Sequence, residues 1–465
     1  MRTSYRLFAT LALLLALSAS AAADAEKFPT GVVIESVPTK ADPKQSYALY
    51  LPSGYTPEKK WPILYAFDPG GRGDVPVKLF KDAAEAFGYI VVGSNNSRNG
   101  LQVGAIVQAF GDDTHARLSI DQRRIFTTGF SGGSRVALAT ALAYQPGIAG
   151  VIACSAGFAG NPSPVAPLPF VVFATAGTND FNFPEMQQLK RKLDGMGATN
   201  RLEVFEGDHE WPPPSVAMRA IAWLELQAMK SARRDKDDAF IDRALRIGTE
   251  KAQALETAGE LYEASLEYSA LAADFKGMRE VKDLEANAAR LAATKEAKAA
   301  IKNERNEEER QRETEVKLQT LLSQLQTSPP NADAFAELRS IVSDLNSKSD
   351  DAKNSSQRRV ARRVLQAVFA QAYEGANNAY LRKDYSNAAA QLEIAVLFRP
   401  KSGRLFYDLA VAYIRSGNKG KAISSLARAV ENGFADVARI EQNEAFDAIR
   451  NDSSFKKVLS AIKKS

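Results

Sequence analysis

The segment Gly129-Phe130-Ser131-Gly132-Gly133 constrains the fold of this 465-residue chain more than any other. It lies between an aromatic and β-branched run at 124–128, which is typical of a strand, and an alanine-rich run at 134–141, which is typical of a helix. A tight turn from strand to helix raises a serine hydroxyl above a sheet, and glycines on each side let the backbone double back. The sequence therefore predicts an α/β fold with Ser131 exposed on such a turn.

A serine hydroxyl is a weak nucleophile at neutral pH and needs a base that is itself oriented by an acid. Hydrolases built on this turn carry the three groups in the chain order serine, acid, histidine. Of the two histidines, only His209 follows Ser131. Asp180 comes just after the apolar run at 170–174, where side chains reach the carboxyl edge of a parallel sheet. We therefore expect Ser131, His209 and Asp180 to be catalytic, with Asp208 as the alternative acid.

Two N–H groups are needed to stabilise the oxyanion of an acyl-transfer reaction. One is expected from Gly132, directly after the nucleophile. The other is expected from the turn after the apolar run at 62–67, where Pro69 has no N–H and Gly70 and Gly71 remain. The sequence does not choose between these two glycines.

Three aromatic residues lie near predicted strand ends and are candidates for a substrate pocket, although aromatic side chains are more often part of a core: Phe130, Phe181 and Trp211.

With these motifs in place, residues 28–230 resemble an α/β-hydrolase of the esterase and polyhydroxyalkanoate-depolymerase type, close to the dienelactone-hydrolase-like enzymes. The resemblance is carried by the segments 67–71, 120–125, 177–180 and 207–211, together with the serine turn. It implies a serine nucleophile, an aspartate and a histidine at the positions named above. The chain departs from the family pattern where Asp68-Pro69 replaces His-Gly and where Asp208, in place of glycine, precedes the histidine.

Short apolar runs alternate with helical stretches from about residue 30, which predicts a parallel sheet with crossover helices. The expected strands are 32–36, 47–51, 63–67, 89–93, 125–128, 150–154, 170–175 and 202–205. Eight strands in this length leave little chain for an inserted lid, so we expect an open site.

After residue 230 the pattern becomes all-α. We expect a helical region at 236–347 with one degenerate repeat and a long charged helix. Residues 302–315 contain no apolar side chain and cannot contribute to a core, so this run is expected to be a solvated stretch of that helix. A mobile spacer is the alternative for that run. Residues 360–465 resemble tetratricopeptide repeats, which are stacked helical hairpins of a solenoid, because small and large residues recur with a 34-residue period: Ala376, Ala388, Leu392 and Ala395 return as Ala410, Ala422, Leu426 and Ala429.

The chain starts with Arg2 and Arg6, an apolar run and small residues up to Ala23, so residues 1–23 are expected to be a cleavable signal peptide. This predicts a periplasmic or secreted protein without a membrane anchor after cleavage. The net charge of +5 is small for this length and gives no case for nucleic acid. No zinc-type ligand spacing occurs, and we expect neither a metal nor a cofactor.

The sequence therefore predicts an exported serine hydrolase that cleaves carboxylic esters, with a helical repeat module that recruits a protein partner or the substrate. Two alternatives stay open. One is a hydrolase-like scaffold with weak or no activity that acts through its repeats, and the other is a serine peptidase, because the same triad serves several acyl substrates.

Overall fold

The computed structural model describes residues 28–160, 166–325, 332–351, 353 and 355–462. The predicted signal peptide at 1–23 lies outside these residues. Within them, no helix combines the length and the hydropathy that are needed to cross a bilayer.

One eight-stranded sheet forms the first part of the described chain, in the order β1-β2-β4-β3-β5-β6-β7-β8. Its strands are β1 (Val33–Pro38), β2 (Ser46–Tyr50), β3 (Trp61–Phe67), β4 (Ile90–Ser94), β5 (Ile120–Phe130), β6 (Ile148–Cys154), β7 (Val171–Gly177) and β8 (Asn200–Phe205). Each predicted strand corresponds to one of them. The sheet is not purely parallel, however, because β2 runs antiparallel to both β1 and β4. The short β1–β2 connection explains the antiparallel β1–β2 pair, since a parallel pair needs a long crossover.

Five helices cover the two faces of the sheet: α1 (Asp74–Phe87), α2 (Gly104–Arg117), α3 (Gly132–Ala143), α4 (Phe183–Gly195) and α5 (Pro214–Lys230). Apolar side chains of α2, α3 and α4 share one core with the sheet, and those of α1 and α5 share a second core on the opposite face. The α/β architecture with crossover helices is therefore as predicted.

The remaining described chain is helical. It contains α6 (Asp238–Thr257), α7 (Leu261–Phe275), α8 (Lys282–Ala292), α9 (Lys295–Leu325), α10 (Ala332–Ser349), α11 (Ser356–Leu381), α12 (Tyr385–Phe398), α13 (Gly403–Arg415), α14 (Lys419–Glu431), α15 (Val437–Glu441), the 3₁₀ helix η1 (Glu444–Ile449) and α16 (Ser453–Ile462). The eight residues that recur with the 34-residue period all lie in α11–α14, and all are buried.

The run without apolar residues lies in the middle of α9, a single helix of 31 residues. From its composition we expected this run to be solvated. In the structure it is not fully solvated, because Glu307 and Gln311 are only 3% and 2% exposed. Both side chains have partners outside α9, on α11 and on the sheet with its helices α1–α5, which is called the sheet domain below. The composition of α9 does not reveal these partners.

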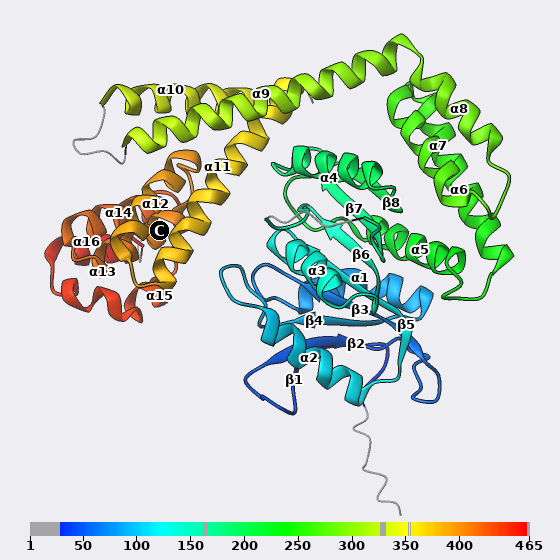
Figure 1. The fold of residues 1–465 in the computed structure, drawn as a ribbon. Helices are drawn as coiled ribbons and strands as arrows, with labels where there is room; N and C mark the ends of the chain where they lie inside the picture. The colour runs from blue at the N-terminus through cyan, green and yellow to red at the C-terminus, as the bar shows by residue number, and fades with distance from the viewer. Residues whose placement is uncertain (1–27, 161–165, 326–331, 352, 354, 463–465) are drawn as a thin grey trace, which may run out of the picture.

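The helical part curves around the sheet domain, from α6–α8 on the right, along α9 above, to α11–α16 on the left (Figure 1). It is attached first at α5, whose last turn shares an apolar core with α6, α7 and α8. A buried polar cluster strengthens this junction, since Asp274 of α7 accepts hydrogen bonds from Arg201 of β8 and Trp223 of α5, both at 2.7 Å. A buried carboxylate needs such donors to offset the loss of water.

Candidate active site

Ser131 lies on the turn between β5 and α3, with a backbone φ of 53°. A positive φ is costly for a residue with a side chain and persists only where the surroundings impose it. The neighbouring glycines are required here by close backbone approaches. A Cβ at Gly129 would lie 2.1 Å from the carbonyl oxygen of Gly133, and one at Gly133 would lie 2.0 Å from that of Phe67. The turn therefore has the strained geometry that the sequence predicts.

Three side chains that are far apart in the sequence meet at the carboxyl edge of the sheet. Nε2 of His209 is 2.9 Å from Oγ of Ser131, and Nδ1 of His209 is 2.7 Å from Oδ1 of Asp180. The serine follows β5, the aspartate follows β7 and the histidine follows β8. The continuous chain of hydrogen bonds has the connectivity in which an imidazole takes a proton from a hydroxyl while a carboxylate holds its other nitrogen.

The carboxylate of Asp180 is completely buried. Its Oδ1 also accepts the backbone N–H of Asn182 at 2.8 Å, whereas its Oδ2 has no hydrogen-bond partner within the described residues. Asp208, the alternative acid, is exposed, and its backbone N–H points to Glu210. Of the two aspartates, only Asp180 contacts the imidazole.

The three predicted pocket aromatics lie around this imidazole. The rings of Phe181 and Phe130 are centred 4.1 and 4.7 Å from the ring of His209, and Trp211 packs on Phe130 at 5.6 Å. Phe130 is only 8% exposed and belongs to the core below the site. Contact with apolar rings limits the rotation of the imidazole and keeps water away from it.

The backbone N–H groups that are predicted to bind the oxyanion differ in whether they already donate a hydrogen bond. Gly132 is the first residue of α3, and its N–H makes no hydrogen bond among the residues that the structure describes. The N–H of Gly70 instead donates to Oδ1 of Asp68 at 2.9 Å, and that of Gly71 donates to the carbonyl oxygen of Asp68 at 3.0 Å. Only the Gly132 amide is therefore available without competition.

In the sequence, Asp68 stood out only because it departs from the family pattern. In the structure, it connects two segments of the site. Its buried carboxylate binds the Arg72 guanidinium at 2.9 and 3.0 Å and accepts the indole N–H of Trp211 at 3.1 Å. The spacing of four residues between the aspartate and the arginine was a local signal for this pair. The carboxylate joins the turn after β3 to the segment that follows the histidine.

A residue of the helical part also reaches this edge of the sheet. Nδ2 of Asn99, in the loop after β4, donates to Oε1 of Glu374 on α11 at 2.9 Å. Asn99 in turn lies against the serine turn, since a Cβ at Gly132 would be 1.8 Å from its Oδ1. Among the described residues, the sheet strands are joined by loops and by the helices named above, but α11 comes from the far end of the chain and contacts a loop beside Ser131.

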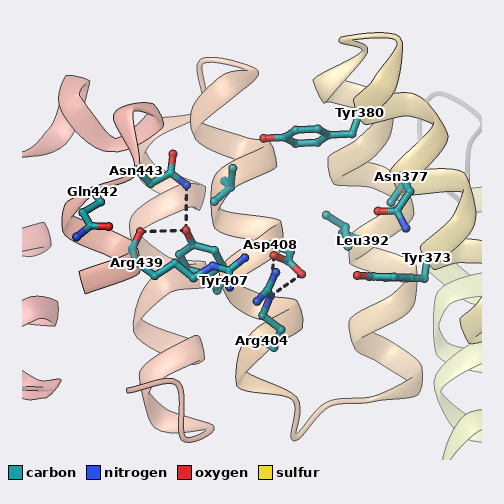
Figure 2. Close-up of a pocket in the computed structure, with 12 residues that line it drawn as sticks. Tyr373, Asn377, Tyr380, Leu392, Arg404, Tyr407, Asp408, Arg439, Gln442 and Asn443 are labelled. Carbon is teal, nitrogen blue, oxygen red and sulfur yellow. Dashed lines mark hydrogen bonds and ion pairs between the residues drawn. The ribbon is translucent and has the colours of Figure 1, made fainter. Parts of the chain in front are cut away.

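A separate pocket of about 430 Å³ lies among α11, α13 and α15 (Figure 2). Figure 2 shows Arg404 paired with Asp408, and Tyr407 bonded to Arg439 and Asn443. Burial raises the pKa of Asp408, and the arginine opposes this. The twelve residues that line this pocket lie between Tyr373 and Asn443, so the pocket is distinct from the Ser131 site. Over the described part of the chain, no group of three or more side chains is arranged as metal ligands.

The chain is similar in part to a known family. Residues 100–184, which include the serine turn and Asp180, match the family described as phospholipase/carboxylesterase. No curated protein matches the chain. The matched family and the observed sheet together support an α/β-hydrolase of the esterase kind.

Several solved structures are similar to part of this chain. Fluorophosphonate-binding serine hydrolase F of Staphylococcus aureus shares 16% identity with a TM-score of 0.35, over 42% of this chain and 99% of its own. A ferulic acid esterase shares 17% identity with a TM-score of 0.35, over 42% of this chain and 97% of its own. An esterase of Pyrobaculum calidifontis shares 14% identity with a TM-score of 0.36, over 43% of this chain and 86% of its own.

Proposed function

We propose that this chain is a serine esterase. Ser131 attacks the ester carbonyl as His209 takes its proton, and His209 then gives the proton to the leaving alcohol. Water hydrolyses the acyl-enzyme by the same route in reverse, and Asp180 stabilises the imidazolium that forms each time. The observation that carries the proposal is the unbroken hydrogen-bonded chain from Ser131 through His209 to the buried Asp180.

The negative charge that develops on the carbonyl oxygen is stabilised first by the N–H of Gly132. The second donor is the turn at 69–71, where the N–H of Gly70 or Gly71 shares its hydrogen between Asp68 and the substrate. This mechanism uses no metal and no cofactor. Phe130, Phe181 and Trp211 supply the apolar wall around the imidazole, and the rings next to it set the shape available to the acyl group.

The proposal is tested with Ser131→Ala in the full-length protein. Loss of the nucleophile is expected to lower kcat on p-nitrophenyl butyrate by about four to six orders of magnitude. A fluorophosphonate probe is expected to label the wild type and not the variant. Hydrolysis by Ser131→Ala at a rate near that of the wild type would disprove the assignment.

The fluorophosphonate label, together with a comparison of peptide and ester substrates, separates the two alternatives. An inactive scaffold would take no label in either form. A serine peptidase would take the label but would cleave peptide amides in preference to p-nitrophenyl esters. The match to phospholipase/carboxylesterase over residues 100–184 favours esters.

We further propose that residues 360–465 form a tetratricopeptide-like module, separate from a hydrolase domain at 28–230 and a linking helical region at 236–347. The pocket among α11, α13 and α15 would recruit bulky substrates, because it combines tyrosine rings with amide and guanidinium donors. Replacing the exposed Asn377 by alanine is then expected to raise KM for bulky esters and to leave p-nitrophenyl acetate unaffected. Export through the predicted signal at 1–23 is tested by the N-terminal sequence of the mature protein.

A further inference from the structure

The loop that carries Asp180 is held from two sides. Within the sheet domain, the N–H of Thr178 donates to the carbonyl oxygen of Phe205 at 2.9 Å, and that of Asn179 donates to Gly207 at 2.8 Å. These bonds fix the start of the loop to β8. Two of the loop's carbonyl oxygens, those of Thr178 and Phe181, are instead bound by side chains from helices beyond residue 290.

The first of these side chains is Arg363 of α11. Its Nε donates to the carbonyl oxygen of Thr178 at 2.9 Å, and its Nη2 donates to the same atom. The guanidinium also lies 4.1 Å from the ring centre of Phe183, the first residue of α4, and its Nη1 is 3.5 Å from Glu307 of α9. Two of these three contacts are with the sheet domain.

Arg363 is only 2% exposed, which is unusual for an arginine. Burial lowers its pKa to about 10, although Glu307 acts in the opposite direction, so it stays charged at neutral pH. A buried charge is tolerated only where partners replace its water. Here the partners come from both parts of the chain, so the contact is a packed interface.

The second side chain is Gln311 of α9, which is also 2% exposed. Its Nε2 donates to the carbonyl oxygen of Phe181 at 2.9 Å. The carbonyl groups two residues before and one residue after Asp180 are therefore each bound by a buried polar side chain of the helical part. Further along α11, Glu374 binds Asn99, which lies beside the serine turn.

We infer that Arg363 and Gln311 are positioning residues for Asp180, and that α9 and α11 complete the active site of the sheet domain. This inference rests on the proposed triad. The helical part then has a role in the reaction itself, in addition to any recruitment through the pocket in Figure 2. If the two carbonyl groups lose their donors, the loop moves, and the 2.7 Å bond between Asp180 and His209 lengthens.

The test uses full-length variants. Arg363→Met keeps an unbranched apolar stem as far as the position of Nε and removes the charge and both donated bonds. Gln311→Met removes one neutral donor. A misplacement of about 1 Å in a catalytic group costs on the order of a hundredfold, so we expect kcat for p-nitrophenyl butyrate to fall by about 10- to 100-fold in both variants. KM is expected to change less than kcat, because both side chains are only 2% exposed and act through the loop that carries Asp180. Arg363→Lys should recover most of the activity, since it keeps the charge and a donor.

Arg362→Met is the matched control. Arg362 is adjacent on α11, but its Nε donates to the carbonyl oxygen of Ser349 on α10, within the helical part. If α11 had a purely structural role, Arg362→Met would be as slow as Arg363→Met. Our inference predicts that Arg362→Met has activity near that of the wild type. If Arg363→Met does not fold, as judged by circular dichroism, Gln311→Met decides alone.

A second readout does not depend on turnover. The proton between Nδ1 of His209 and Asp180 is expected to give a strongly downfield proton NMR signal that is weakened in Arg363→Met and Gln311→Met and kept in Arg362→Met. An inactive wild type that showed this pattern would disprove the proposed esterase and support the positioning role. Unchanged kcat and an unchanged signal in both methionine variants, or no recovery with lysine, would overturn the inference.

Discussion

Replacement of Asp180 by asparagine tests the most specific part of the proposed mechanism. The carboxylate is fully buried and its Oδ1 lies 2.7 Å from Nδ1 of His209. Asparagine has nearly the same shape but no charge. If its oxygen keeps the place of Oδ1, the histidine loses a charged partner, and if its amide group turns there, the histidine is held in the wrong tautomer.

The size of the effect follows from this geometry. A bond of 2.7 Å puts the centres of the imidazolium and carboxylate charges roughly 4 Å apart, where two unit charges attract by about 4 kcal/mol at an effective dielectric constant of about 20. Since about 1.4 kcal/mol corresponds to a factor of ten in rate, loss of the charge alone lowers kcat by about a thousandfold. The wrong tautomer extends this to about ten thousandfold.

The assay is steady-state hydrolysis of p-nitrophenyl butyrate by Asp180→Asn, with Asp208→Asn as the matched control. Asp208 adjoins the histidine in sequence but is exposed and makes no contact with the imidazole. We expect KM to be nearly unchanged in both variants and kcat to fall only in Asp180→Asn. A loss of less than tenfold in that variant, or an equal loss in Asp208→Asn, would refute the role of Asp180 as the acid.

Three further predictions concern stability. Gly133→Ala puts a methyl group 2.0 Å from a carbonyl oxygen and should lower the free energy of unfolding by about 1–3 kcal/mol or more in urea denaturation, whereas Gly195→Ala, with nothing within 4 Å, should not. Burial raises the pKa of Asp113, but a backbone N–H, an arginine and a tyrosine hydroxyl outweigh it and lower the pKa overall. The carboxylate therefore contributes stability above about pH 3.9 that is lost as the pH falls through the lower native pKa, so the deficit of Asp113→Asn in denaturation should shrink from neutral pH to about pH 3. Leu426→Ala, at a fully buried site, should cost about 2–5 kcal/mol in thermal unfolding, whereas Leu381→Ala, at a site 66% exposed, should cost little.

Local patterns were sufficient for the sheet, and they led to the proposed site residues. Strand and helix periodicity, with glycines where backbones touch, located all eight strands and the turn of Ser131. The chain order of serine, acid and histidine selected Asp180 and His209, because strand ends of a parallel sheet meet at one edge whatever the residues between them. The sequence missed the antiparallel β2, since pairing direction depends on the connection and not on periodicity.

Charged residues were harder to interpret. The apolar-free run in α9 was expected to be solvated, yet Glu307 and Gln311 are buried. Their burial depends on what packs against the helix, and nothing within α9 indicates that Arg363, 56 residues after Glu307, packs against it. The bonding of the Gly70 and Gly71 amides also could not be read from the sequence, because it depends on the folded turn, in which both N–H groups donate to Asp68.

The sequence by itself determined the class of fold, the tight turn that carries Ser131 and the chain order of the three proposed catalytic residues, because these depend on short-range periodicity and on the steric needs of a tight turn. Only the tertiary structure decided that α9 and α11 bind the carbonyl groups on either side of Asp180. The physical reason is that a polar side chain becomes buried only when a distant segment supplies the hydrogen bonds that water would otherwise make.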